Sequence, residues 1–156
     1  MASTLSAATM TVTLTESINL NGKNQGGTQT LSIPSIATVN KRIIDVPTSE
    51  VEIIAMSTAV ASGTFIESDV LYIRITNLDD TYHVTLTFKG ENNEEFSVKL
   101  DKGQSFIYNG DLSGGVVDTF VSASGAVDVT SLVDLVNITA LADSAACDVE
   151  VFVACK

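Results

Sequence analysis

The chain has 156 residues and a mass of 16.4 kDa, which suits one domain with a sizeable core. Its composition, 45% hydrophobic and 17% charged, argues against a disordered chain, and no apolar run approaches the roughly 20 residues of a membrane helix. The formal net charge of -11, with the few basic residues scattered, argues against binding to nucleic acid.

The first residues are small and polar, and we predict that residues 1–8 form an N-terminal arm. They contain neither a positively charged start nor an apolar stretch, so we expect no secretory signal and synthesis in the cytoplasm. Residues 9–20 alternate strictly, which predicts one long strand with a bend or bulge at Glu16. One face of this strand is apolar and the other polar: Met10, Val12, Leu14, Ile18 and Leu20 against Thr11, Thr13, Thr15, Ser17 and Asn19.

The next segments are predicted to be short strands separated by turn residues. The run NGKNQGG at 21–27 predicts a turn that starts with Asn-Gly. Pro34 is expected to end the strand before it, and Pro47 to end the following strand. Residues 60–69 are predicted to be a connection. The strands expected in this part of the chain are 30–33, 38–46 and 50–56.

The strictest alternation lies in the middle of the chain. Residues 82–89 and 96–100 place aliphatic and aromatic side chains at every second position on both sides of a charged turn. The flanking segments 70–78 and 105–108 repeat the pattern, and each connection is short. We therefore predict an antiparallel meander of these segments.

The last part of the chain is less regular. We predict a loop at 109–115, and residues 116–123 are a candidate for a further strand. Residues 131–144 allow two structures. Aliphatic residues at helical spacing would line a helix, but the β-branched residues favour a short turn followed by a strand, which we predict. Residues 147–156 alternate again and predict a closing strand.

Together these segments predict an all-β fold, a two-layer antiparallel β-sandwich that is jelly-roll-like and has about nine or ten short strands. Helices do not alternate with strands, which argues against a parallel sheet. The lack of a fixed repeat argues against a β-helix or a propeller. The predicted organisation is an N-terminal arm at 1–8 and a single sandwich domain at 9–156.

The sequence contains no constellation of catalytic residues, so we predict neither an active site nor a cofactor. Nucleophilic catalysis needs a base beside the nucleophile, and the single histidine, His83, is expected in mid-strand on the polar side. Acidic residues gather in turns as solvated loop tips; a calcium ion bridging these loops is the alternative, although the EF-hand spacing is absent. Cys147 and Cys155 lie roughly 27 Å apart if they share one extended strand, so we predict two free thiols and no metal site.

Two binding functions find little support in the composition. A carbohydrate-binding module usually presents exposed aromatic rings, but the chain has no Trp and only 3 Tyr. An ice-binding array would need the threonine row of the first strand repeated across neighbouring strands. Only residues 85–87 echo that row, so ordinary β-propensity explains the threonines.

The segment LYIRITNLDDTYHVTLTFKGENNEEFSVKLDKGQSFIY, residues 71–108, resembles a pattern in small β-rich virion proteins of tailed bacteriophages, notably marine and cyanobacterial ones. The shared pattern is a strand with IRITNLD, a returning VTLTF strand, and an aromatic strand after a Gly turn. This resemblance implies a non-enzymatic component of the virion that is made in the host cytoplasm. It carries over no active site.

From the resemblance we expect a capsid decoration or cement protein that stabilises the phage head as a dimer or trimer. Its expected partners are further copies and the major capsid protein or other virion proteins, with no nucleic acid and no membrane. A tail- or fibre-associated component and a carbohydrate-binding surface module are the alternatives, and no enzyme activity is predicted. The residues predicted to form the interface are Ala2, Ser3, Thr4, Leu5, Thr11, Thr13 and Thr15.

Overall fold

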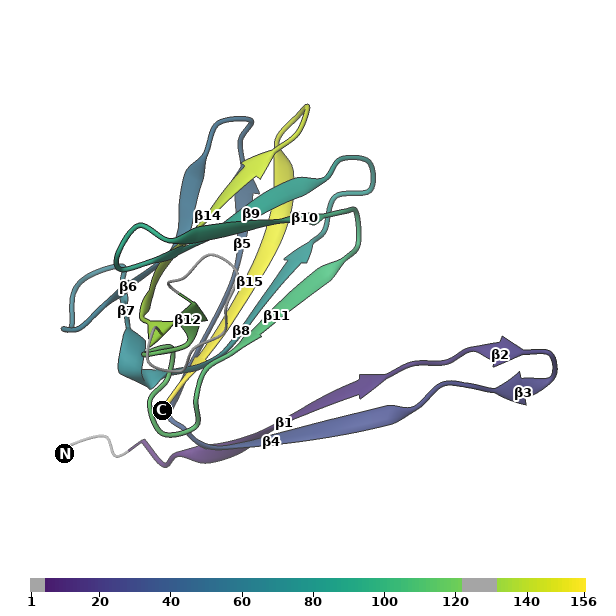
Figure 1. Cartoon of the computed structure of the whole chain (residues 1–156), viewed down its shortest axis with the longest axis horizontal. Coiled ribbons are helices and arrows are strands. Elements are labelled where there is room, and N and C mark those ends of the chain that lie inside the picture. Colours follow the sequence, from purple (N-terminus) through teal and green to yellow (C-terminus); the bar gives the residue numbers. More distant parts are fainter. Residues whose placement is uncertain (1–4, 122–131) are drawn as a thin grey trace.

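The computed structural model describes residues 5–121 and 132–156, and it confirms the predicted all-β class. Within these residues the regular structure consists of β-strands and one 3-10 turn, with no α-helix. The strands build a two-layer body, and a long two-stranded ribbon projects from the base of that body (Figure 1).

Two sheets make up the body, and neighbouring strands are antiparallel except for the short β6–β7 pair. The 5-stranded sheet has the order β10 (Glu95–Leu100), β9 (Val84–Gly90), β14 (Leu135–Ala142), β6 (Val51–Ser57) and β7 (Phe65–Ile66). The 4-stranded sheet has the order β11 (Ser105–Asn109), β8 (Val70–Asn77), β15 (Cys147–Cys155) and β5 (Thr38–Val46).

The core lies between the two sheets, and the two-residue rhythm of the sequence supplies it. In β9 every second residue is fully buried, and β15 shows the same alternation along most of its length. The ring of Phe88 stacks on Phe96 at 4.7 Å and meets Phe106 from the other sheet at 5.0 Å. Aromatic contacts of this kind add to the burial of apolar area. The alternation therefore did predict which side chains face the core.

Only the central β9–β10 hairpin of the predicted meander forms, because the chain changes sheets both before and after that hairpin. Strand β8 pairs with β11 in one sheet, and β9 pairs with β10 in the other. Asn77 sits at the crossing and is fully buried. Its side-chain amide donates to the carbonyl of Tyr82 at 2.9 Å and to that of Leu100 at 3.2 Å. These bonds join the two places where the chain passes between the sheets.

Smaller differences concern the connections. Residues 60–69 contain the short strand β7 and a 3-10 turn, Glu67–Asp69, rather than a plain connection. Of the candidate strand 116–123, only β12 (Phe120–Val121) forms, and residues 122–123 lie outside the described part. The strand predicted within 131–144 is confirmed by β14, but where a turn was expected before it the chain forms the short strand β13 (Leu132–Val133). Residue 131 itself is not described.

The first strand leaves the sandwich altogether. Strand β1 (Ala8–Thr15) pairs with β4 (Thr28–Ile36), and the short strands β2 (Asn19–Leu20) and β3 (Lys23–Asn24) continue the pair to a tight turn at Asn21 and Gly22. Both turn residues have positive φ, which explains the Asn-Gly sequence there. We call residues 8–36 the ribbon. Residues 9–20 and 30–33 were expected in the sandwich, and this part of the prediction is wrong.

Pro34 does not end its strand. Ala8 pairs with Ile36 and Met10 pairs with Ile33, so Pro34 and Ser35 lie together opposite one residue in a β-bulge. Ser35 has a φ of 63°, as the sharp local bend requires. A bulge accepts proline because the missing N–H leaves no ladder bond unmade. The division into an arm at 1–8 and a domain at 9–156 remains a prediction.

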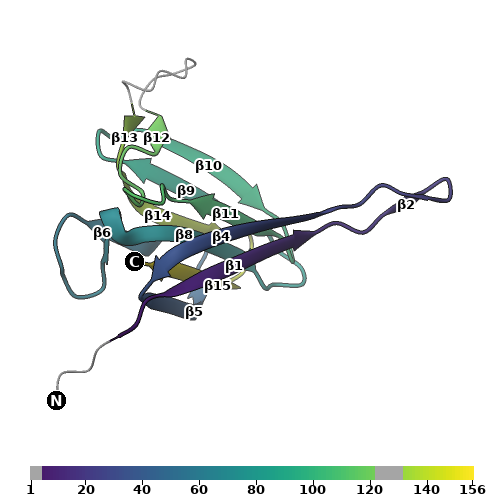
Figure 2. The ribbon, with the colours of Figure 1, turned by 90° about the horizontal axis from the view of Figure 1, so that it is seen from below.

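The ribbon crosses the outer face of the 4-stranded sheet at the base of the body and then extends well beyond it (Figure 2). Ala37 connects β4 directly to β5, and its N–H donates to the carbonyl of Cys155 at 2.9 Å. Cys147 and Cys155 lie at opposite ends of β15 as free, buried thiols, which confirms the predicted unbonded cysteines.

Candidate interaction surface

The ribbon has an apolar face and a hydroxyl face, and its register keeps them separate. Strand pairing sets Met10 opposite Ile33 and Val12 opposite Leu31. On the other face the pairs are threonine and serine: Thr11 with Ser32, Thr13 with Thr30 and Thr15 with Thr28. Since side chains in a strand alternate between faces, the part of the ribbon near the body is amphipathic. Farther out the apolar face becomes mixed, because Leu14 lies opposite Gln29 and Leu20 opposite Lys23.

The apolar face anchors the ribbon to the body. Ile33 is only 1% exposed, and Ile36 is also buried. They form a hydrophobic cluster separate from the main core, with Tyr72 of β8, Ala154 of β15 and partly buried residues of β1. The ribbon is thus held at its base by packing, while its far end extends away from the described part of the body (Figure 1).

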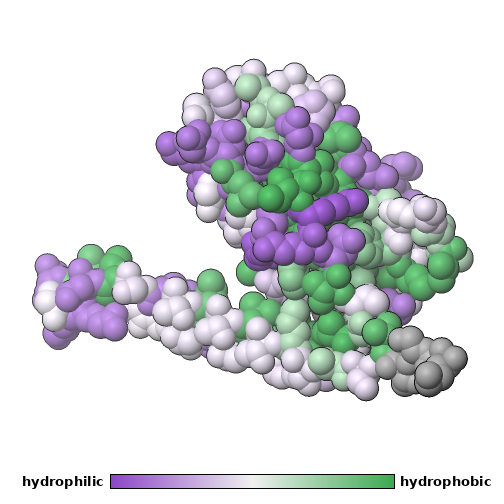
Figure 3. Space-filling model, turned by 180° about the vertical axis from the view of Figure 1, so that it is seen from behind, coloured by the Kyte–Doolittle hydropathy of each residue, from purple (hydrophilic) through white to green (hydrophobic). Residues whose placement is uncertain are grey.

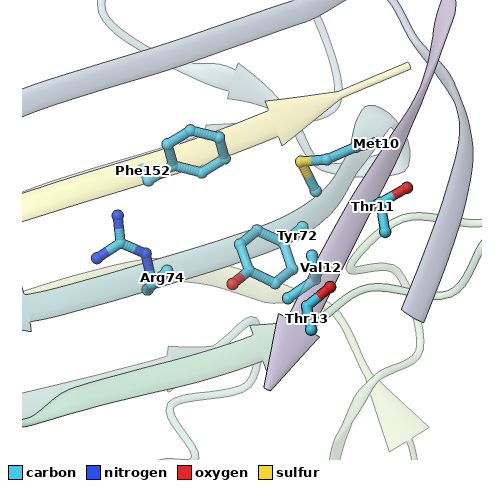
Figure 4. A pocket seen from close by; sticks show the side chains of 7 residues that line it. All are labelled: Met10, Thr11, Val12, Thr13, Tyr72, Arg74 and Phe152. Carbon is cyan, nitrogen blue, oxygen red and sulfur yellow. The ribbon is translucent and has the colours of Figure 1, made fainter. Parts of the chain in front are cut away.

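A pocket of about 360 Å³ lies where β1 crosses the sheet. Met10 points from β1 toward Phe152, and Val12 lies beside Tyr72 (Figure 4). The rings of Tyr72 and Phe152 meet edge to face with their centres 6.0 Å apart. The guanidinium of Arg74 lies 5.8 Å from the centre of the Phe152 ring, within the range of a cation–π contact.

Charged side chains on this outer face form one network around Glu150. Arg74 Nη2 donates to Glu150 Oε1 at 2.6 Å, and Lys41 Nζ lies 3.0 Å from Glu150 Oε2. The hydrogen bond from Arg74 and then that from Lys41 hold the pKa of Glu150 below its ordinary value. Burial raises the pKa of the Tyr72 hydroxyl nearby. Lys41 remains largely exposed, so one positive side chain of the network faces solvent.

Several large apolar side chains stand exposed on the ribbon and on the outer face of the 4-stranded sheet, including Leu31 and Ile107 at 37% and 38%. Five others are more exposed, between 47% and 61%. On the ribbon they are Leu14, Ile18 and Leu20, and on β5 they are Val39 and Ile43. Figure 3 shows hydrophobic atoms recurring along the ribbon, on the side where the body lies. Grouped exposed apolar residues of this kind mark interaction surfaces.

The ribbon differs from the body in charge. Glu16 and Lys23 are its only charged residues, and they cancel. The whole formal net charge of -11 therefore belongs to residues 37–156. Two such bodies repel one another, but a neutral ribbon approaches an acidic body without that penalty.

The residues predicted to form the interface are only partly placed by the structure. Ala2, Ser3 and Thr4 lie outside the described residues. Leu5 is 72% exposed, and Thr11, Thr13 and Thr15 are exposed on the hydroxyl face of the ribbon. Nothing tests whether these residues contact a partner, so this interface remains a prediction.

The five exposed apolar residues Leu14, Ile18, Leu20, Val39 and Ile43 were not among the predicted interface residues. For the three on the ribbon, the sequence did contain a signal. Met10 to Leu20 alternates on one side of an Asn-Gly turn, and Leu31 and Ile33 alternate on the other. Two alternating segments around Asn-Gly predict a hairpin. For Val39 and Ile43 no such signal exists, because apolar residues at every second position equally predict a core-facing side.

Other chemistry-bearing residues have local structural roles. His83 lies in the loop before β9, not in mid-strand as predicted, with Nδ1 3.6 Å from Asp143 Oδ2. Asp79 accepts the backbone N–H of Tyr82 at 2.6 Å and that of Thr81 at 2.7 Å, and these bonds lower its pKa. In residues 5–121 and 132–156, no group of three or more His, Cys, Asp or Glu side chains is arranged to hold a metal ion.

Glu67 is the one acidic side chain that the described residues bury, at 7% exposure. Burial raises its pKa first, and repulsion from Asp134 and Glu91 adds to the rise. Its backbone carbonyl accepts the N–H of Val116 at 2.9 Å, so the 3-10 turn fixes the loop before β12.

No protein-family model matches this sequence, and no curated protein was found to be similar to it. The described part of the chain also has no helix long and apolar enough to cross a membrane.

Proposed function

We propose that this protein is a non-enzymatic structural protein of a phage virion, and most specifically a decoration or cement protein that stabilises the head as a dimer or trimer. The observation that carries the proposal is the ribbon with its exposed apolar face. An isolated two-stranded hairpin is at best marginally stable in water, so a ribbon of this length implies a surface that covers it. In an assembly that surface belongs to a neighbour.

We also propose that the body is a jelly roll. The strand orders support this proposal, because sequence neighbours occupy the same position in the two sheets: β11, β8, β15 and β5 in one, and β10, β9, β14 and β6 in the other. In a jelly roll, a long antiparallel pair of strands wraps around the barrel as one unit. This wrapping places strands that are neighbours in sequence at the same position in the two sheets. Jelly rolls occur in capsid proteins and in lectins, so the architecture alone does not select between shell and sugar binding.

The distribution of charge supports a role in a crowded assembly. An acidic body keeps many copies soluble and away from the nucleic acid of the genome before assembly. The resemblance of residues 71–108 to small phage virion proteins points in the same direction. Synthesis in the host cytoplasm and incorporation into the virion follow from that proposal.

Two alternatives remain proposals beside this one. A tail- or fibre-associated component would use the same ribbon but at a lower copy number. A carbohydrate-binding surface module is favoured by one observation, the pocket that Tyr72, Phe152 and Arg74 line, since aromatic rings beside a polar group suit a sugar. A glycan array tests this second candidate directly, and the variant Phe152→Ala should then abolish any binding that the array detects.

Quantitative mass spectrometry of purified phage particles tests the main proposal. We expect the protein in the particles at a copy number comparable to that of the major capsid protein. A copy number like that of tail proteins would support the tail-associated alternative. Absence from purified particles would refute a virion role of either kind.

A further inference from the structure

We infer that the distal ribbon of one copy packs on the outer face of the 4-stranded sheet of a second copy, with Leu14, Ile18 and Leu20 covering Val39 and Ile43. The inference names the partner of the surface on which the proposed function rests, and to that extent it depends on that proposal. Each molecule carries both halves of this contact, so the association can be reciprocal, as in a two-fold dimer, or continue around a ring.

The first argument is continuity along the ribbon. At its base the apolar face is covered by the outer face of the molecule's own sheet, through Tyr72 and Ala154. Farther out on the ribbon, the apolar residues Leu14, Ile18 and Leu20 are about half exposed. Leu14 still lies beside Tyr72 and Ile107 of its own body, but at β2 the ribbon has left the body (Figure 1), so a second copy offers the same kind of cover there.

The second argument is the spacing of the side chains. The ribbon presents Leu14, Glu16 and Ile18, and β5 presents Val39, Lys41 and Ile43. Both triplets have an apolar residue, a charged residue and an apolar residue at alternate positions, and the two charges are opposite. Lys41 is largely exposed, and its present partner Glu150 also has Arg74. Lys41 is therefore able to pair with the Glu16 carboxylate of a neighbouring copy. The apolar residues on either side of Glu16 then contact those on either side of Lys41.

The third argument concerns dimensions and charge. The six steps from Leu14 to Leu20 span roughly 20 Å when extended, and the four steps from Val39 to Ile43 along β5 span roughly 13 Å, at about 3.3 Å per residue. The distal part of the ribbon is thus long enough to cover both of these residues on β5. Because the ribbon is neutral, it also approaches the acidic body of a second copy without adding like-charge repulsion.

Sedimentation equilibrium of the purified full-length chain over a range of concentrations tests the apolar contact. We expect wild-type protein to self-associate, and Leu14→Asp and Ile43→Asp each to weaken the association by at least about tenfold. The matched control is Thr13→Asp, which places the same charge on the adjacent position of the hydroxyl face and should change little. Circular dichroism confirms that each variant is folded.

A charge exchange tests the register and does not place a charge at an apolar position. Glu16→Lys and Lys41→Glu should each weaken association, and the double variant should recover most of the wild-type value. A wild-type chain that is monomeric at every concentration overturns the inference. So does a Thr13→Asp variant that is weakened as much as Leu14→Asp, which would place the contact on the threonine face, or a double variant that fails to recover.

The two proposals fail in different ways. A chain that associates as expected but is absent from virions would refute the virion role and leave the ribbon contact standing. A chain that is abundant in virions but monomeric and unaffected by Ile43→Asp would do the opposite. In that case the ribbon would bind another particle protein, and cross-linking from position 20 in intact particles would identify it.

Discussion

Replacing Ile33 with alanine should release the ribbon from the body while leaving the sandwich folded. Ile33 is 1% exposed and belongs to the small cluster that joins the ribbon to Tyr72 and Ala154, apart from the main core. At about 0.8 kcal/mol for each of roughly three carbon atoms removed, the lost burial is about 2.4 kcal/mol. The cavity left behind adds to this, within the range of about 2–5 kcal/mol known for such changes.

Hydrogen exchange measured residue by residue separates this local effect from global unfolding. A loss of about 2.8 kcal/mol corresponds to roughly 100-fold faster exchange for amides that open with the ribbon. We expect that acceleration at Val12 and Leu31 in the ribbon, and little change at Ile54 in the body core. The matched control is Leu14→Ala, which removes a half-exposed side chain and should change ribbon exchange only slightly when the protein is monomeric.

Two results would refute the reasoning. If ribbon amides exchanged at the wild-type rate in Ile33→Ala, the cluster would not be what holds the ribbon. If Ile54 lost as much protection as Val12, the ribbon and the body would be one cooperative unit rather than two.

Three further changes test the corner, the buried acid and the charge network. Asn77→Ala should destabilise the fold by about 2–4 kcal/mol in urea denaturation, because it leaves two buried carbonyls without their donor; a loss under about 0.5 kcal/mol would contradict that role. Glu67→Gln should raise the melting temperature at pH 7, because the raised pKa of Glu67 means that its charged form is disfavoured in the fold. This gain should vanish below the ordinary pKa of 4.5, where the carboxyl is protonated in both the folded and the unfolded chain. Glu150→Gln should lower the free energy of unfolding by about 1 kcal/mol or less at pH 7, because the lowered pKa makes the Glu150 carboxylate stabilising above pH 4.5. This loss should disappear as the pH falls through the lowered pKa. A difference that does not depend on pH would argue against the ion pairs with Lys41 and Arg74.

The strand partners show where sequence reasoning stops. Strands β8 and β9 were predicted to pair, because both alternate and few residues connect them. A connection of that length serves a hairpin or a passage between sheets equally well. The buried side chain of Asn77 stabilises the passage between sheets, because its amide donates to the carbonyl of Tyr82 and to that of Leu100. An asparagine next to a predicted turn does not reveal this, because most such residues serve the turn itself.

The ribbon is a second example. The alternation from Met10 to Thr15 correctly predicted a strand with an apolar and a hydroxyl face, but the strand expected to run on to Leu20 is interrupted at residues 16–18. It did not predict that the strand leaves the sandwich, because an apolar face looks the same whether it covers a core, the outside of a sheet or a neighbouring molecule. Pro34 misled in a related way: proline is excluded from a regular ladder, but the bulge with Ser35 gives it a place within the strand.

The sequence by itself determined the kind of structure at most positions and the inward or outward direction of the side chains. These properties are local, since a two-residue period follows from the geometry of an extended chain. Only the tertiary structure decided which strands pair, where the chain changes sheets, and that residues 8–36 project as a ribbon. Backbone hydrogen bonds are alike between any two strands, so the choice of partner depends on the packing of the whole molecule.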